Sequence, residues 1–348
     1  MTTPTAPTWQ ISIDSTAPPE WEKFLQRCPD GHFFAHPVWT RAVCCHLPGA
    51  RPIWLTVRDG ERLVAGMVAV RRVHRLFGRL VSHFDGTPGG PLVAPDLTDP
   101  ERDDLFQALV QAYAHLRRQR NLAATLTLNS YHERRYGHLL SRSVWHRQGI
   151  PTAFMPLAGG LAHVEMHVLK KNRRNERNRS LKRGCSYQVT VDPEILEAYY
   201  PIYYAATERW GIEPIPSLLL RQLLTAGEGR AYLTCVWYEG ELIGGHLNLH
   251  WCDRVTVWNG ATQPAHDDKY PATLLIWADL EEACRRGASW LDLGGSAGRA
   301  KLANFKRLLG AQEEIRGHYV LESSWLRMWR RGQSWLQRFG RPAATATS

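Results

Sequence analysis

Residues 231–251 read AYLTCVWYEGELIGGHLNLHW and open the stretch Arg230–Ala311, around which the fold is organised. The pattern predicts a strand over residues 231–238, a Glu239-Gly240 turn and a second strand over residues 242–251. Acid-Gly pairs between two β-rich runs are strong signals for a tight turn, so we expect a hairpin here.

The rest of the stretch alternates between strand and helix patterns. We expect a strand over Arg254–Ala261, a long helix over Pro271–Arg286, a short strand over Trp290–Leu293, a helix over Gly298–Leu309 and a strand over Ile315–Leu321. This order predicts an α/β unit with helices against a mixed sheet.

A fainter copy of the hairpin lies earlier in the chain. Leu55–Val70 and Thr234–Leu249 both contain a strand, an acid-Gly turn and then two aliphatic residues, a small residue and Gly, with Arg62 extra in the first copy. A separation of about 180 residues indicates two copies of one α/β unit. The alternative is that any hairpin with an acidic turn has this pattern. Between the copies, Pro100–Arg120 predicts a helix and His132–Ile150 gives no clear pattern.

Length and composition favour a two-domain globular protein. The chain has 348 residues, and its seven cysteines form no CxxC pair, which argues against a disulfide framework or a zinc site and for a reducing cytoplasm. The first residues lack a basic start and an apolar run, and no stretch approaches the ~20 apolar residues of a membrane span. We therefore expect a cytoplasmic protein.

The positive charge is concentrated in one segment. Of the formal net charge of +10, Lys170–Arg183 carries +7, because eight Lys or Arg residues accompany the single acid Glu176. This concentration predicts one anion-facing patch on an otherwise weakly charged protein.

Four features together resemble the Fem branch of the GNAT superfamily, the aminoacyltransferases related to FemA, FemB and FemX. They are FFAHPVW over residues 33–39, the Lys/Arg-rich run over residues 172–184 that ends in Gly, WLDLGG over residues 290–295 and LANFKRLLGA over residues 302–311. The resemblance spans about residues 32 to 311.

The resemblance implies an α/β (α+β) fold of tandem acyl-CoA N-acyltransferase (GNAT)-like domains, each a mixed, mainly antiparallel sheet flanked by helices. We place an N-terminal GNAT-like domain at residues 1–160 and a C-terminal one at residues 161–322. Residues 323–348 are expected to form a tail helix over Trp325–Phe339 and a disordered end. This basic amphipathic helix would dock onto the protein or lie on an anionic membrane at the inner face.

The implied function is an acyltransferase that forms an amide bond. In the Fem-type hypothesis an aminoacyl group moves from aminoacyl-tRNA to an amine of a peptidoglycan precursor or a peptide natural product. One alternative is an acyl-CoA-dependent N-acyltransferase, and another is a non-catalytic nucleic-acid-binding protein with degenerate GNAT domains. No tightly bound cofactor and no metal site are expected, with aminoacyl-tRNA or acyl-CoA as co-substrate. The acyl group, the acceptor, the oligomeric state and the presence of a donor site in the first domain stay open.

The chemistry requires a neutral amine, a stabilised oxyanion and a positioned donor. By resemblance, Lys306 is the candidate for oxyanion stabilisation, and Phe305 for stacking on a donor base. Asp292 is the best carboxylate for a base, with a loop-capping role as the alternative. His246 and His250 share a strand face; for His246 we weigh acceptor binding against a packed or hydrogen-bonded role.

Donor and acceptor contacts are assigned to the basic run and to the first domain. The donor-binding candidates of the run are Lys170, Lys171, Arg173, Arg174 and Arg177, which suit tRNA phosphates. By resemblance to the Fem enzymes, which place a basic residue for the acceptor diphosphate near this position, Arg41 and Trp39 are the acceptor-binding candidates in the first domain.

The segment before the long helix departs from the GNAT pattern. GNAT acetyltransferases usually carry a Gln/Arg-x-x-Gly-x-Gly/Ala loop there, whose N–H groups bind the CoA pyrophosphate. Residues 263–271 instead read QPAHDDKYP, with no glycine and with two acids that would repel a diphosphate. This difference favours a tRNA donor or an unconventional acyl donor.

Overall fold

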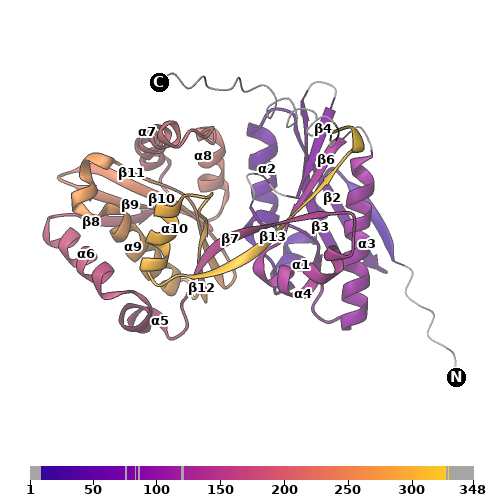
Figure 1. Ribbon diagram of the computed structural model, residues 1–348, viewed down its shortest axis with the longest axis horizontal. Helices are drawn as coiled ribbons and strands as arrows, with labels where there is room; N and C mark the ends of the chain where they lie inside the picture. Colours follow the sequence, from indigo (N-terminus) through magenta and orange to yellow (C-terminus); the bar gives the residue numbers. More distant parts are fainter. Residues whose placement is uncertain are drawn as a thin grey trace, which may run out of the picture.

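The computed structural model describes residues 9–326 and 328, except residues 75, 76, 83, 85, 86, 119 and 120. Within these residues, one continuous sheet runs through both halves of the molecule (Figure 1). Its strand order is β1-β2-β3-β4-β6-β13-β7-β12-β11-β10-β9-β8, and β5 pairs with β3 beside this path.

The strands are β1 (Gln10–Asp14), β2 (Ala50–Asp59), β3 (Arg62–His74), β4 (Phe77–Val81), β5 (Leu92–Val93), β6 (Asn121–Thr127), β7 (His146–Pro156), β8 (Ser186–Thr190), β9 (Ala231–Tyr238), β10 (Glu241–Trp251), β11 (Arg254–Thr262), β12 (Trp290–Gly295) and β13 (Gln312–Glu322). The α-helices are α1 (Trp21–Arg27), α2 (Pro37–His46), α3 (Asp99–Arg117), α4 (Ser130–Ser141), α5 (Gly160–His163), α6 (Lys171–Lys182), α7 (Pro193–Trp210), α8 (Ser217–Ala226), α9 (Pro271–Arg285) and α10 (Ala300–Leu308). Short turns of other helix types are η1 (Phe33–Ala35), η3 (Val164–Val168) and η4 (Pro264–Lys269).

The sheet order reads the same from both ends. β1-β2-β3-β4-β6 corresponds to β8-β9-β10-β11-β12, and in each series the last two strands are parallel and are connected through a long helix, α3 or α9. The strand arrangement therefore agrees with the duplication that the two hairpins predicted. We call β1 to α4 (residues 10–141) the N-terminal unit and β8 to α10 (residues 186–308) the C-terminal unit.

The two units exchange their last strands. β7 follows α4 in the chain but pairs with β12, whereas β13 follows α10 but pairs with β6, and β7 and β13 pair with each other. Both strands cross between the units at the centre of Figure 1. The domain boundary near residue 160 stays a prediction, because the ladder runs without interruption from one unit into the other.

The helices expected over residues 100–120, 271–286 and 298–309 are present, and their ends differ from the prediction by at most three residues. α3 begins with a capping box in which Thr98 and Glu101 bond reciprocally, and Pro271 occupies the first turn of α9. The stretch that gave no clear pattern, His132–Ile150, contains most of α4 and the start of β7. Only Tyr136 and Leu140 give α4 a buried apolar face, and part of that packing comes from distant β13.

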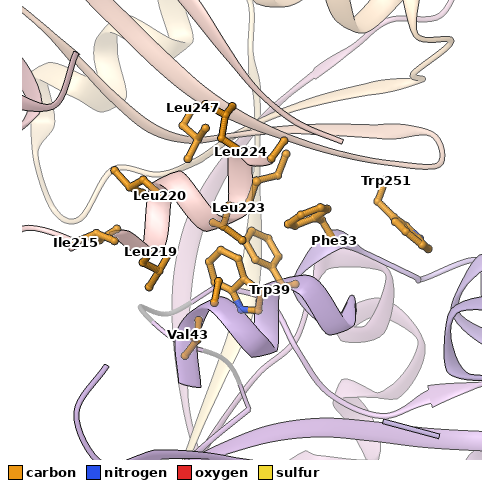
Figure 2. Packing of buried hydrophobic residues seen from close by; sticks show 14 of the residues in the cluster. Phe33, Trp39, Val43, Ile215, Leu219, Leu220, Leu223, Leu224, Leu247 and Trp251 are labelled. Carbon is orange, nitrogen blue, oxygen red and sulfur yellow. The ribbon is translucent and has the colours of Figure 1, made fainter. Parts of the chain in front are cut away.

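A hydrophobic cluster joins the two units. Figure 2 shows Trp39 and Val43 of α2 facing Leu219, Leu220 and Leu223 of α8, and all five side chains are buried. Because helices of both units share this cluster, it fixes the position of the C-terminal unit's strands relative to the N-terminal unit. Most of the predicted tail helix lies outside the described residues.

Candidate active site

The parallel strands β11 and β12 separate in the middle of the C-terminal unit. They pair only from Arg254 opposite Trp290 to Thr256 opposite Asp292. β11 then continues to Thr262, while β12 follows β7 with an irregular register between Asp292 and Gly294. We call the separation between residues 257–262 of β11 and residues 293–295 of β12 the split. Among the strand pairings of the described chain, this edge of β11 has none, so its backbone groups can bind an extended substrate.

A β-bulge lies in β11 at the split. Leu247 of β10 pairs with Asn259 and the next residue, Asn248, pairs with Val257, so Trp258 is the extra residue. Bulges are common beside active sites because they redirect side chains. Here the Trp258 indole meets Trp39 of α2, and Asn259 accepts a hydrogen bond from the Tyr199 hydroxyl at 2.7 Å.

Lys306 lies buried at the end of β12. Its Nζ donates to the carbonyl oxygens of Leu293, Gly294 and Gly295 at 2.6, 3.0 and 2.9 Å. Burial lowers the pKa of Lys306 to about 8; Asp292 opposes this shift, and Arg299 and Arg316 add to it. The ammonium thus fixes the strand end beside the split and places a positive charge there.

Asp292 is fully buried and bonded on both oxygens. Its Oδ1 accepts from the Gly294 N–H at 2.8 Å, and its Oδ2 pairs with the Arg316 guanidinium of β13. Arg316 also lies over the Phe154 ring of β7, 5.0 Å from its centroid. The loop-capping role weighed for Asp292 is therefore present, and Arg316 is a partner that the sequence pattern did not identify.

His246 belongs to a buried polar network under α9. Its Nδ1 lies 2.5 Å from Oδ2 of Asp279, whose Oδ1 accepts from Nδ2 of Asn248 at 2.8 Å. The same amide donates to Oγ1 of Thr234 at 2.9 Å. Asp279 was missed from the sequence, although an acid within the apolar pattern of residues 274–280 was a signal for a buried partner.

The basic run forms α6, which packs against α9. Its inner arginines already have partners: Arg173 bonds to Glu176 at 2.6 Å, Arg177 bonds to Glu165 at 2.7 Å, and Arg174 bonds to the carbonyl of Glu165 at 2.8 Å. Arg173 also lies 5.0 Å from the centroid of Phe305, so two donor-binding candidates meet.

The outer face of α6 carries an exposed basic surface, in which Arg183 pairs with Asp268. Its exposed cations are Lys170, Lys171, Arg179, Lys182 and Arg183. This surface, which we call the basic face, suits an anion better than the inner arginines do, because fewer of its charges are neutralised.

The segment before α9 is the turn η4, closed by Tyr270. Tyr270 has a φ of 58°, and α9 begins with Pro271, which has no N–H. Asp268 pairs with Lys269 at 2.9 Å, and its carbonyl accepts from Arg183. Carboxylates therefore lie at the place where GNAT acetyltransferases usually carry a diphosphate-binding loop, as the sequence indicated.

The two acceptor candidates of the N-terminal unit differ in exposure. Arg41 is exposed, whereas Trp39 is fully buried between Phe34 and Trp258. Trp39 can act on the site through the packing of Trp258.

The N-terminal unit does not repeat the split. After β4, the Ser82 N–H donates to the Thr125 carbonyl, and the Gly89 N–H donates to the Thr127 carbonyl. The described residues after β4 thus stay bonded to β6, whereas in the C-terminal unit β11 separates from β12. Among the described residues, no group of His, Cys, Asp and Glu is arranged to hold a metal ion. Likewise, no described helix has the length and apolarity to cross a membrane.

Comparison with known proteins identifies a domain family for part of the chain. Residues 168–307 match the family model described as an acetyltransferase (GNAT) domain. A search of the curated proteins finds no match to this chain.

Solved structures of similar fold cover most of the chain. The crystal structure of FemX has a TM-score of 0.71 at 12% identity, covering 95% of this chain and 100% of that chain. A tandem GNAT protein from the clavulanic acid biosynthesis pathway, solved without acetyl-CoA, has a TM-score of 0.55 at 16% identity, covering 90% and 98%. L-PGS from Bacillus licheniformis has a TM-score of 0.56 at 13% identity, covering 90% and 96%. The tandem GNAT-like fold implied by the sequence is confirmed.

Proposed function

We propose that this chain, an acyltransferase with a GNAT domain on a tandem fold like that of FemX, forms an amide bond by moving an aminoacyl group from aminoacyl-tRNA to an amine. The acceptor class is a peptidoglycan precursor or a peptide natural product. The split between β11 and β12 is the proposed place of the reacting ester.

The observation that carries the choice of donor is the segment before α9. A diphosphate is usually bound by free N–H groups at a helix start, aided by the helix dipole. Here Pro271 removes one N–H, and Asp267 and Asp268 add negative charge next to it. A CoA pyrophosphate would meet repulsion at this place, whereas tRNA does not require it.

The basic face supports a polyanionic donor. Its five exposed cations extend along α6, which packs on α9 and lies near the split through the contact of Arg173 with Phe305. A tRNA acceptor stem bound there by phosphate contacts would direct its 3′ end toward Phe305, where the terminal base could stack.

Lys306 is the proposed source of oxyanion stabilisation. Its ammonium is buried beside residues 293–295, so its charge acts in a site of low dielectric. Asp292 holds the same strand end through the Gly294 N–H and pairs with Arg316, which suits a positioning role.

Acyl-CoA remains the alternative donor. It is favoured by the GNAT domain match over residues 168–307 and by two cations beside η4, Arg183 and Lys269. If a phosphate displaced the Asp268 carboxylate, Arg183 and Lys269 would both be available to bind that phosphate.

Incubation of the purified protein with pools of labelled aminoacyl-tRNA or with a panel of acyl-CoAs, each with amine acceptors, separates the two donors. Amine-dependent loss of labelled amino acid from tRNA is the expected result. Release of free CoA without loss of label from tRNA would overturn the tRNA proposal in favour of the alternative.

A further inference from the structure

A buried carboxylate lies in the middle of α9, which is otherwise apolar on its inner face. Asp279 has no exposed surface, and both of its oxygens are bonded to side chains of β10, namely His246 and Asn248. Burying a carboxylate is costly unless it is fully hydrogen-bonded. Asn248, which also donates to Thr234, bonds one carboxylate oxygen, and the His246 imidazole is the partner of the other.

The imidazole lies directly on Gly260 of β11. A Cβ placed on Gly260 would come within 2.4 Å of Cδ2 and 2.9 Å of Nε2 of His246, so any larger residue would displace the ring. Gly260 pairs with His246 across the sheet, and its other edge faces the split. The ring therefore reaches from Asp279 over β11, and its Nε2 lies close to Gly260, a residue that borders the split.

The two ring nitrogens have different surroundings. Nδ1 is next to the buried carboxylate of Asp279, which favours a proton on that nitrogen. Nε2 then carries the lone pair, and 11% of the side chain is exposed. A carboxylate that holds Nδ1–H and leaves Nε2 free is the arrangement that makes histidine a general base.

We propose that His246 is the general base of the transfer, oriented by Asp279, and this proposal rests on the proposed function. Nε2 accepts a proton from the acceptor amine as its nitrogen bonds to the carbonyl carbon of the aminoacyl ester. The bond from that carbon to the ribose oxygen breaks, and the proton passes from Nε2 to the departing oxygen. Atoms and charge balance without a further reactant.

Few ionisable groups lie around the His246 ring in the described chain. Asp279 is the charged group in contact with the ring. Tyr232 and Cys235 of β9 also sense Asp279, but burial and then the Asp279 charge raise the pKa of both, to about 12 for Cys235. Both stay neutral near pH 7.

Three variants separate a base from a structural hydrogen bond. His246→Asn retains an N–H donor for Asp279 but has no basic nitrogen. Asp279→Asn removes the carboxylate that orients the ring. Thr234→Val is the matched control, because it disturbs the same network through Asn248 without removing a hydrogen bond of the imidazole.

The kinetic experiment uses whichever donor proves active in the donor panel. We expect His246→Asn to lower kcat by on the order of 10²–10⁴-fold and to remove the rise of the rate with pH. Asp279→Asn should lower kcat less and shift that rise. Thr234→Val should keep kcat within about twofold of the wild type while losing as much thermal stability as His246→Asn. If His246→Asn turns over like Thr234→Val, His246 is not the base.

A second measurement does not depend on the donor. Nitrogen NMR of the full chain labelled at histidine should show His246 as the Nδ1–H tautomer above its pKa, with that preference lost in Asp279→Asn. A dominant Nε2–H tautomer would overturn the proposal even if no donor were active. If the tautomer is as expected but the protein uses only acyl-CoA, the tRNA proposal fails. The kinetics of the three variants in the CoA reaction then decide whether His246 is the base.

Discussion

The indole of Trp39 in α2 meets the indole of Trp258 in β11 edge to face, with ring centroids 4.8 Å apart and ring planes at 79°. Trp258 is the bulged residue at the split, and Trp39 belongs to the other unit. The two rings therefore connect the interface between the units to the strand that borders the candidate active site.

Removing the Trp39 indole should affect both stability and activity. Trp39→Ala is expected to lower the free energy of unfolding by about 3–5 kcal/mol, because it leaves a large cavity in the core. Urea denaturation measures this loss. Activity should fall further than the unfolded fraction explains, since Trp258 loses its support.

The matched control is Trp290→Ala, which removes an indole that is 36% exposed. Trp290→Ala should lower the free energy of unfolding by well under half as much as Trp39→Ala, because less buried apolar surface is lost. Equal losses for the two variants would contradict the role assigned to the Trp39–Trp258 contact.

The pKa of Lys306 predicts opposite pH effects on stability and rate. The value is about 8 in the folded chain against 10.5 for an ordinary lysine. Between these values the unfolded chain holds a proton that the folded chain has lost, so stability rises with pH across this window and is flat outside it. Across this window the free energy of unfolding of the wild type should rise, relative to that of Lys306→Met, by at most about 3 kcal/mol.

The transfer rate should fall over the same window if the Lys306 ammonium stabilises the oxyanion. Chemical denaturation and initial rates at a series of pH values test both parts. A wild-type rate that stays constant from pH 8 to pH 10 would show that Lys306 takes no part in the chemistry. Its role would then be limited to the hydrogen bonds with residues 293–295.

Asp292 and Arg316 should behave as one unit. Asp292→Asn is expected to lower the free energy of unfolding by about 3 kcal/mol, because it leaves the buried Arg316 charge without its partner. Arg316→Met should cost a similar amount. The double variant should lose less than the sum, with a coupling energy of about 1–3 kcal/mol from a double-mutant cycle in urea. Additive losses would show that the pair contributes nothing of its own.

The basic face should determine the salt dependence of tRNA binding. Replacing Lys170, Lys171 and Lys182 by Gln should reduce the slope of log K against log salt by about 2–3, because each lost phosphate contact removes ~0.7–0.9. Filter binding of charged tRNA between 50 and 200 mM salt, as an order-of-magnitude range, measures the slope. The control replaces three exposed cations of the N-terminal unit, Lys23, Arg27 and Arg51, by Gln. A similar drop in both variants would indicate that the attraction is not specific to α6.

Local patterns in the sequence were enough for most elements of the C-terminal unit. The hairpin of β9 and β10, the helices α9 and α10 and the strands β12 and β13 lie within a few residues of their predicted positions. Their apolar periods are strong and their ends carry Pro or Gly signals. β4 was not predicted, because a five-residue strand without alternation gains its stability from β3 and β6.

The partners of the candidate site residues were beyond the sequence. Asp292 and Lys306 were named from a resemblance, but Arg316 lies 24 residues beyond Asp292 in the chain and meets it only because β13 and β12 both pair with β7. The same holds for His246 and Asp279, which join through the packing of α9 on β10.

The sequence by itself determined most of the elements, the repeat and the location of the excess positive charge, because these depend on residues that are near one another in the chain. The tertiary structure alone decided that the last strands of the units are exchanged, that β11 and β12 separate beside Trp258 and that Trp39 is buried behind them. It also decided which cations of α6 are already neutralised. These outcomes depend on pairing and burial between distant segments, and local periodicity carries no information about which distant segments meet.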